Sequence, residues 1–302
     1  MKAMSLPIAP AKTDSAPGAP AYVIALGRGV TLRLAAYSVL LLFLSVGVFS
    51  ALTGIAGFDS TSRNWVTPVL YVVVYFGTLV AHELVHGLFF RIFGGSPRYG
   101  AGVLYFMPYF YTTSPGAFPL RRMIIIVLAP LLVLSPLSLV AALLVPALAG
   151  YLAVAFIGNT AGAVGDIWLT ICLIRFRGLK DVTVVDLPNG QAIYTRDAKA
   201  DEIAGKLSAR DERDPGFVGQ WITAASAVFV AGVLAGLVGP FFTDSLLIGP
   251  AQFPLIAFTR SSQGFAWTGS LASPLLAGLL FALAARLFSR RKPHGAELQT
   301  VQ

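Results

Sequence analysis

Long apolar runs constrain this chain more than any other feature of its sequence. Six runs have about 20 residues each, the length that an α-helix needs to cross the roughly 30 Å hydrocarbon layer of a bilayer. Only 12% of the residues are charged, about half the fraction that a soluble domain carries. We therefore predict an all-α multi-pass membrane protein with about six transmembrane helices, at residues 34–56, 66–90, 123–146, 150–173, 217–239 and 271–288.

The lysines and arginines predict how these helices are oriented. If the N-terminus is cytoplasmic, all of the 22 basic residues except Arg63 and Arg260 fall on cytoplasmic segments or at their membrane edges. Because basic residues gather on the cytoplasmic side, both termini are expected there. The net charge of +8 then follows from this bias and from attraction to the lipid bilayer, and it requires no nucleic-acid partner. The single cysteine, Cys172, is expected to be a small buried apolar residue.

The predicted helices divide the chain into five segments. A disordered cytoplasmic tail without a secretory signal comes first, and four helices form the membrane core. A cytoplasmic insert follows, then two further transmembrane helices joined by an outside loop, and finally a basic cytoplasmic tail. The patch LLIGPAQFPLIAF (246–258) is broken by two prolines and is expected to be an interfacial loop. The segments are 1–30, 31–174, 175–215, 216–289 with its loop at 240–270, and 290–302.

Two non-helical segments are expected to form β-hairpins. Between the second and third helices, GVLYF and YFYTTS flank Met107-Pro108, and this apolar hairpin is expected to be re-entrant at membrane depth. The alternative is an aromatic interfacial loop. In the insert, DVTVVDLPNGQAIYTR predicts two short strands about a Pro-Asn-Gly turn, and AKADEIAGKLSAR predicts a short helix.

The second predicted helix contains HELVH, residues 82–86, inside an otherwise apolar run. On a helix that turns about 100° per residue, His82 and His86 lie about 40° apart and Glu83 about 100° from His82, so all three share one side. This HExxH arrangement is typical of a zinc site in which two imidazoles bind the metal and the carboxylate acts on its water. Ionisable groups at membrane depth are costly and usually functional. The alternative is a pair of buried histidines that bond only to neighbouring groups.

Asp166 is the predicted third ligand. Of the 14 acidic residues, only Glu83 and Asp166 fall inside predicted membrane helices, and the remaining histidine, His294, lies in the basic tail. With a rise of 1.5 Å per residue, the two histidines lie roughly 8–13 Å from the cytoplasmic helix ends and Asp166 roughly 13 Å. The three side chains can therefore meet at one depth.

The fourth predicted helix also carries Asn159, within GNTAGAVGDIW (158–168). Small residues spaced four apart favour a close approach of another helix. Asn159 and Asp166 are seven residues apart and face one way, so Asn159 is a candidate for binding a substrate carbonyl or for orienting Asp166. A purely structural interhelical hydrogen bond is the equal alternative.

With HELVH, the apolar hairpin and GNTAGAVGDIW, residues 65–180 resemble the site-2-protease-like intramembrane zinc metallopeptidases, and within that group bacterial membrane proteins of the zincin peptidase type. The resemblance implies zinc bound by His82, His86 and Asp166, with Glu83 as the acid/base. It also implies a prokaryotic cytoplasmic (inner) membrane location. The chain departs from the site-2-protease pattern, because Asp166 is followed by isoleucine instead of glycine and the spacing from Asn159 is one residue shorter.

The expected activity is hydrolysis of peptide bonds in a membrane protein or membrane-associated peptide, with Glu83 as general base. An extended substrate could add as a strand to the 101–114 hairpin, for which Val103 and Tyr105 are the candidate binding residues. Two alternatives remain: a catalytically silent scaffold or regulator that retains the site, and a metal-binding transporter. Glu83 discriminates between the protease and a transporter, because transport requires no base beside the ligands.

Overall fold

The computed structural model describes residues 19–25, 28–54, 66–104, 107–187, 190–211, 216–238, 242–261, 264–270 and 272–289. The predicted tail residues 1–18 and 290–302 lie outside this range, as does Tyr105. The chain divides into two compact units, which we describe separately. The first unit comprises Met1–Leu26, Leu79–Val133 and Gly165–Arg210, and the second comprises Gly27–Thr78, Leu134–Val164 and Asp211–Gln302.

Helices dominate the fold, as the apolar runs predict. Four of the described helical segments are long and apolar enough to cross a membrane, and two further apolar helices, at Phe217–Gly232 and Ala272–Leu287, are shorter. The helices are α1 (Arg28–Thr53), α2 (Val66–Ile92), α3 (Leu120–Leu144), η1 (Pro146–Leu148), α4 (Ala149–Gly162), α5 (Val164–Ile174), α6 (Lys199–Asp211), α7 (Phe217–Val238) and α8 (Ala272–Ser289).

The helix predicted at 150–173 is divided in the structure. Helix α4 ends at Gly162, Ala163 has a non-helical ψ of 5°, and α5 begins at Val164. The prediction of one continuous helix is therefore wrong at this point. The physical reason is the pair Gly162 and Gly165, because glycine resists helix formation more than any residue except proline.

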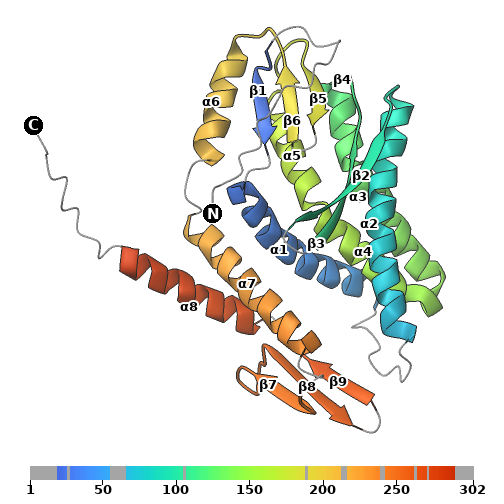
Figure 1. Ribbon diagram of the computed structural model, residues 1–302, viewed down its shortest axis with the longest axis vertical. Coiled ribbons are helices and arrows are strands. Elements are labelled where there is room, and N and C mark those ends of the chain that lie inside the picture. The colour runs from blue at the N-terminus through green and yellow to red at the C-terminus, as the bar shows by residue number, and fades with distance from the viewer. Residues whose placement is uncertain are drawn as a thin grey trace, which may run out of the picture. The chain divides into compact units, whose positions relative to one another are not determined.

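A four-stranded antiparallel sheet lies in the first unit (Figure 1), with the strand order β1-β6-β5-β4. The hairpin of β5 (Thr183–Leu187) and β6 (Gly190–Tyr194) is the one predicted for the insert, and α6 follows it as predicted. The sheet also recruits β1 (Tyr22–Ala25) and β4 (Ala117–Pro119), neither of which was predicted. The prediction of disorder through residue 30 is wrong for β1, because an apolar four-residue strand is stabilised by its distant partner β6.

The main core of the first unit lies between this sheet and the described parts of α2, α3 and α5. One face of the sheet contributes Ile24, Phe118, Val184 and Ile193. The helices contribute residues that are equally buried, including Phe90, Met123, Ile126 and Leu173, and the turn after α5 contributes Phe176. This apolar packing fixes the ends of α2 and α5, which carry the predicted metal ligands, and the end of α3.

Strands β2 (Arg98–Leu104) and β3 (Met107–Thr113) form the hairpin predicted after α2. Its register differs from the prediction, because Met107 and Pro108 lie in β3 and Leu104 pairs with Met107. Proline is tolerated there because both strands of a two-stranded sheet are edge strands. Since Pro108 has no N–H, its pair with Val103 is of the non-hydrogen-bonded kind, and the Val103 amide points away from β3.

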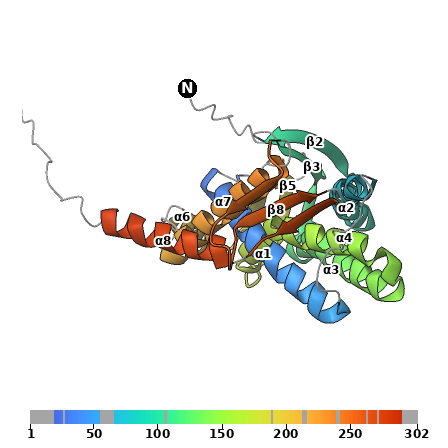
Figure 2. The ribbon, with the colours of Figure 1, turned by 90° about the horizontal axis from the view of Figure 1, so that it is seen from below.

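In the second unit, α7 contacts both α1 and α8, and α1 also contacts α4. Figure 2 shows the strands β7 (Ser245–Ile248), β8 (Ile256–Ser261) and β9 (Gly264–Thr268) side by side as a three-stranded sheet. The prediction of a loop for 246–258 is therefore wrong. Pro250 and Pro254 lie between β7 and β8, where no ladder N–H is required, so the strands on either side can still pair.

Candidate metal centre

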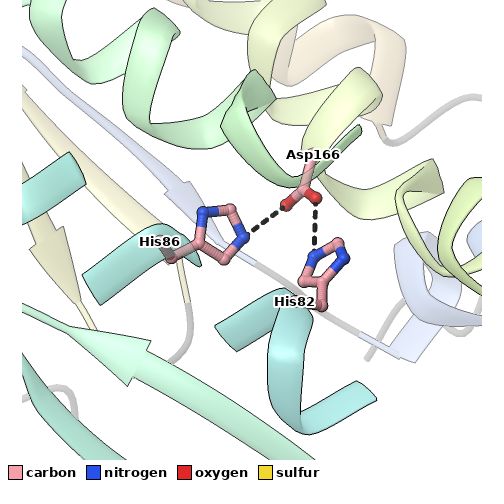
Figure 3. A group of neighbouring side chains, drawn as sticks. All are labelled: His82, His86 and Asp166. Atoms are coloured by element: carbon pink, nitrogen blue, oxygen red, sulfur yellow. Dashed lines mark ion pairs between the residues drawn. The ribbon is translucent and has the colours of Figure 1, made fainter. Parts of the chain in front are cut away.

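Three side chains predicted to bind a metal meet in the first unit. His82 and His86 lie one turn apart on α2, and Asp166 lies in the first turn of α5. One ligand atom from each lies within 4.8 Å of the others, and Figure 3 shows the carboxylate between the two imidazoles. The helix spacing thus presents both histidines on one face, as the sequence predicts.

The distances within this cluster fit a small divalent cation. Asp166 Oδ2 lies 3.0 Å from His82 Nε2, and Asp166 Oδ1 lies 3.6 Å from His86 Nε2. Ligand atoms about 2.0–2.1 Å from a tetrahedral zinc ion are about 3.3 Å apart, so the two distances fall on either side of that value. Asp166 Oδ2 is buried, and no hydrogen bond in the described part of the chain satisfies it. Two imidazoles and a carboxylate with an unsatisfied oxygen are a suitable donor set for zinc.

The cluster is largely shielded from solvent. The side chains of His82 and His86 are each 12% exposed and that of Asp166 is 15% exposed. A catalytic zinc site keeps one coordination position for water or substrate beside three protein ligands. Three protein ligands are the number that such a site requires.

Glu83 lies between the two histidines on α2 and is partly buried. Its backbone carbonyl accepts a hydrogen bond of 2.9 Å from the Thr112 hydroxyl on β3. Sequence analysis had singled out the carboxylate but not this contact, which fixes β3 on the turn of α2 that carries the cluster.

Gly87 and Tyr99 make a second contact between the hairpin and α2. A Cβ atom at position 87 would lie 2.6 Å from Tyr99 Cζ, closer than real Cβ contacts, so the Tyr99 ring would have to shift to admit a side chain there. Tyr99 pairs with Thr112 across the hairpin, and their side chains lie on the same face. The hairpin thus rests on the Glu83–Gly87 turn through one cross-strand pair.

Asp186 is an acidic neighbour that sequence analysis missed. It interacts electrostatically with His86, Glu83 and Asp166, and burial raises its pKa to about 7, although a hydrogen bond from Gln191 lowers it. Gln191 Nε2 donates to Asp186 Oδ1 over 3.4 Å, and Gln191 Oε1 is buried without a hydrogen bond among the described residues. Our count of acidic residues covered only the predicted helices, so a carboxylate on a strand escaped it.

The strand period explains why this pair is buried. Asp186 lies two residues beyond Val184 on β5, and Gln191 lies two residues before Ile193 on β6. Alternate residues share a face, so both polar side chains project from the apolar face of the sheet. The sequence signal that could have identified this pair is the register of the β5–β6 hairpin, which places Asp186 opposite Gln191.

Asn159 is not one of the clustered residues. Asn159 lies in the second unit, is 1% exposed, and donates a hydrogen bond of 2.8 Å to Ser135 Oγ on α3. This contact matches the structural alternative stated for Asn159. Val103 lies on β2 in the first unit, and Tyr105 lies outside the described residues.

Residues 75–178 match the profile of a protein family described as "Putative zincin peptidase". The match covers about a third of the chain and includes the three clustered side chains, Glu83 and the β2–β3 hairpin. No curated protein and no solved structure gives a significant match. The comparison supports a likeness to zincin-type metallopeptidases. Because zincins use zinc, it also favours zinc as the metal for this cluster.

Proposed function

We propose that this chain is an intramembrane zinc metalloprotease that hydrolyses peptide bonds of membrane-associated substrates. The observation that carries the proposal is the meeting of His82, His86 and Asp166 beside Glu83, within helices of membrane-spanning length. Neither histidine is close to Asp166 in the sequence, so their convergence is a property of the fold.

In this proposal His82, His86 and Asp166 hold the metal. When bound, zinc supplies a Lewis acid that makes water a better nucleophile at neutral pH and polarises the substrate carbonyl. Glu83 accepts a proton from the attacking water as the new C–O bond forms. It then delivers a proton to the departing amine as the C–N bond breaks.

The β2–β3 hairpin is the proposed binding surface for an extended substrate. The Val103 amide points away from β3 and can donate to an added strand, whereas Pro108 leaves a gap on the opposite edge. Val103→Pro removes this donor at a position that makes no ladder bond to β3, and Tyr105→Pro tests the position two residues further along the chain. Both substitutions should impair cleavage and leave the zinc content intact. Unchanged turnover in both would contradict strand addition.

The proposed setting is a prokaryotic cytoplasmic membrane with six spans and both termini cytoplasmic. Four helices meet the length and hydropathy required, and α7 and α8 are the candidates for the remaining two. A lipid bilayer and a membrane protein or peptide substrate are the proposed partners.

The zinc content of purified full-length variants tests the site. We expect close to one zinc ion per chain in the wild type and in the exposed-residue control Asp201→Ala, and much less in His86→Ala and Asp166→Ala. Zinc that survives Asp166→Ala unchanged would contradict the assignment of the third ligand.

The role of Glu83 separates the protease from the scaffold and the transporter. Glu83→Gln should retain zinc but not cleave a transmembrane reporter peptide in proteoliposomes that the wild type cleaves. Zinc movement across the same vesicles that persists in Glu83→Gln, with no cleavage by either protein, would favour the transporter instead.

A further inference from the structure

A proline in the middle of α3 leaves one backbone carbonyl without its helical donor. Pro130 is fully buried, and α3 continues through it from Leu120 to Leu144. A helical carbonyl accepts from the N–H four residues later, and proline has none, so the carbonyl of Ile126 loses this partner. Ile126 is only 1% exposed, so a donor from within the protein has to replace it.

His86 supplies that donor. Its Nδ1 lies 2.9 Å from the carbonyl oxygen of Ile126. Because a carbonyl can only accept, Nδ1 carries the proton, and Nε2 of the neutral ring keeps its lone pair. Nε2 is also the atom that faces Asp166 Oδ1. The freed carbonyl thus determines which nitrogen of His86 is available to a metal.

We propose that Pro130 is a positioning residue for the metal centre: it frees the Ile126 carbonyl, which fixes the tautomer and ring orientation of His86. The inference rests on the proposed zinc site. Groups that hold the second nitrogen of a histidine ligand typically change metal affinity by about 10–100-fold. An alanine at position 130 would restore the N–H that competes with His86 for this carbonyl.

Pro136 offers a matched control in the same helix. It is exposed, and the carbonyl that it frees belongs to Leu132, which is 63% exposed. Among the described residues, no side chain donates to that carbonyl. Replacing either proline makes the same chemical change in α3, but only the change at position 130 affects a metal-site contact.

The test compares Pro130→Ala and Pro136→Ala in the full-length protein in detergent. Zinc affinity is measured by competition with a chromophoric chelator, and the melting temperature is measured on the metal-free protein. Pro130→Ala should raise the zinc Kd about 10–100-fold, and Pro136→Ala should leave it nearly unchanged. Alanine favours helix more than proline does, which offsets the small cavity that Pro130→Ala leaves in the core, so the melting temperatures of both variants should stay close to that of the wild type. Weaker zinc binding without a loss of stability distinguishes positioning from a structural role.

A second readout needs no metal. The chain has three histidines, so ¹⁵N-histidine spectra of the metal-free protein can be assigned with His82→Ala and His86→Ala. At a pH high enough for the imidazole ring to be neutral, the wild type and Pro136→Ala should show His86 protonated at Nδ1, and Pro130→Ala should lose this preference.

Two results would overturn the inference: unchanged zinc affinity and tautomer in Pro130→Ala, or equal losses of affinity in both proline variants. A wild type that takes up no zinc would refute the proposed function. The tautomer spectra would then still decide whether Pro130 sets the protonation of His86.

Discussion

The two halves of α2 have the same helical backbone but face different environments. Between Val69 and Val73 the side chains are more than half exposed and apolar, except at Leu70 and Tyr71, which are less exposed. From His82 to Gly87 the polar groups have specific partners from β3, α3 and α5. Lipid suffices to solvate an apolar helix surface, whereas buried polar groups require protein donors and acceptors. Changes in the second half should therefore have large effects and changes in the first half small ones.

The largest expected effect is on catalysis at Glu83. Loss of a general base typically costs about 10²–10⁴-fold in rate, so Glu83→Gln should lose this much kcat on a transmembrane reporter peptide. Val72→Leu in the apolar half should leave kcat within about twofold, because it keeps an apolar surface. A similar loss from both substitutions would remove the distinction between the two halves.

Metal removal should have the next largest effect. A ligand that binds only the folded protein stabilises it by about 4 kcal/mol at a thousandfold excess over Kd. Added zinc should therefore raise the melting temperature of the chelator-treated wild type and leave that of Asp166→Ala unchanged. A rise of equal size in both proteins would place zinc binding outside the cluster.

The acidic neighbour of the polar half predicts a pH dependence. Burial raises the pKa of Asp186 from 3.8 to about 7, so the folded metal-free protein holds this proton more tightly than the unfolded chain does. Below about pH 4 this group makes its full contribution to the free energy of unfolding. As the pH rises from about 4 to about 7, that contribution falls by up to about 1.4 kcal/mol per pH unit. Asp186→Asn should remove this loss and be more stable than the wild type at pH 8. Denaturant unfolding at pH 4, 6 and 8 measures the unfolding free energy of both proteins. If the prediction is wrong, the difference between the wild type and Asp186→Asn will be the same at all three pH values.

The smallest expected effect compares two glycines of α2. Gly87→Ala places a methyl group against Tyr99 and should cost about 1–3 kcal/mol of stability. Gly77 has nothing within 4 Å of the same position, so Gly77→Ala should be neutral or stabilising. Tyr99→Ala should rescue Gly87→Ala, and thermal unfolding of the double variant checks this. Absence of rescue would mean that the hairpin does not rest on Gly87.

Local patterns in the sequence were enough to predict much of the site. The spacing of His82 and His86 sets their common face, and the scarcity of acidic residues in apolar helices identified Asp166. The β5–β6 hairpin was predictable because its turn and strand residues are adjacent in the chain. The histidine and hairpin signals each lie within a few helical turns or one hairpin, and the signal for Asp166 is a simple count over the predicted helices.

Features that depend on distant partners were not predictable in this way. Strands β1 and β4 are short and are stabilised by residues far along the chain, and Asp186 is buried only because the sheet face is covered. The role of Pro130 depends on how α2 and α3 are aligned, because the His86 ring must reach the Ile126 carbonyl. The spacing of apolar residues along either helix does not predict this alignment. The sequence shows which side chains are costly to bury, and the tertiary fold determines which groups satisfy them.

The strand order of the first unit has a consequence for biosynthesis. Strand β6 lies between β1 and β5, so β1 has no partner in its sheet until the ribosome has made residues 190–194. By then the chain already contains both histidines and Asp166. The sheet that packs against α2 and α5 is thus among the last parts of this unit to form, and a chain truncated before β6 would carry all three clustered side chains without the packing that supports them.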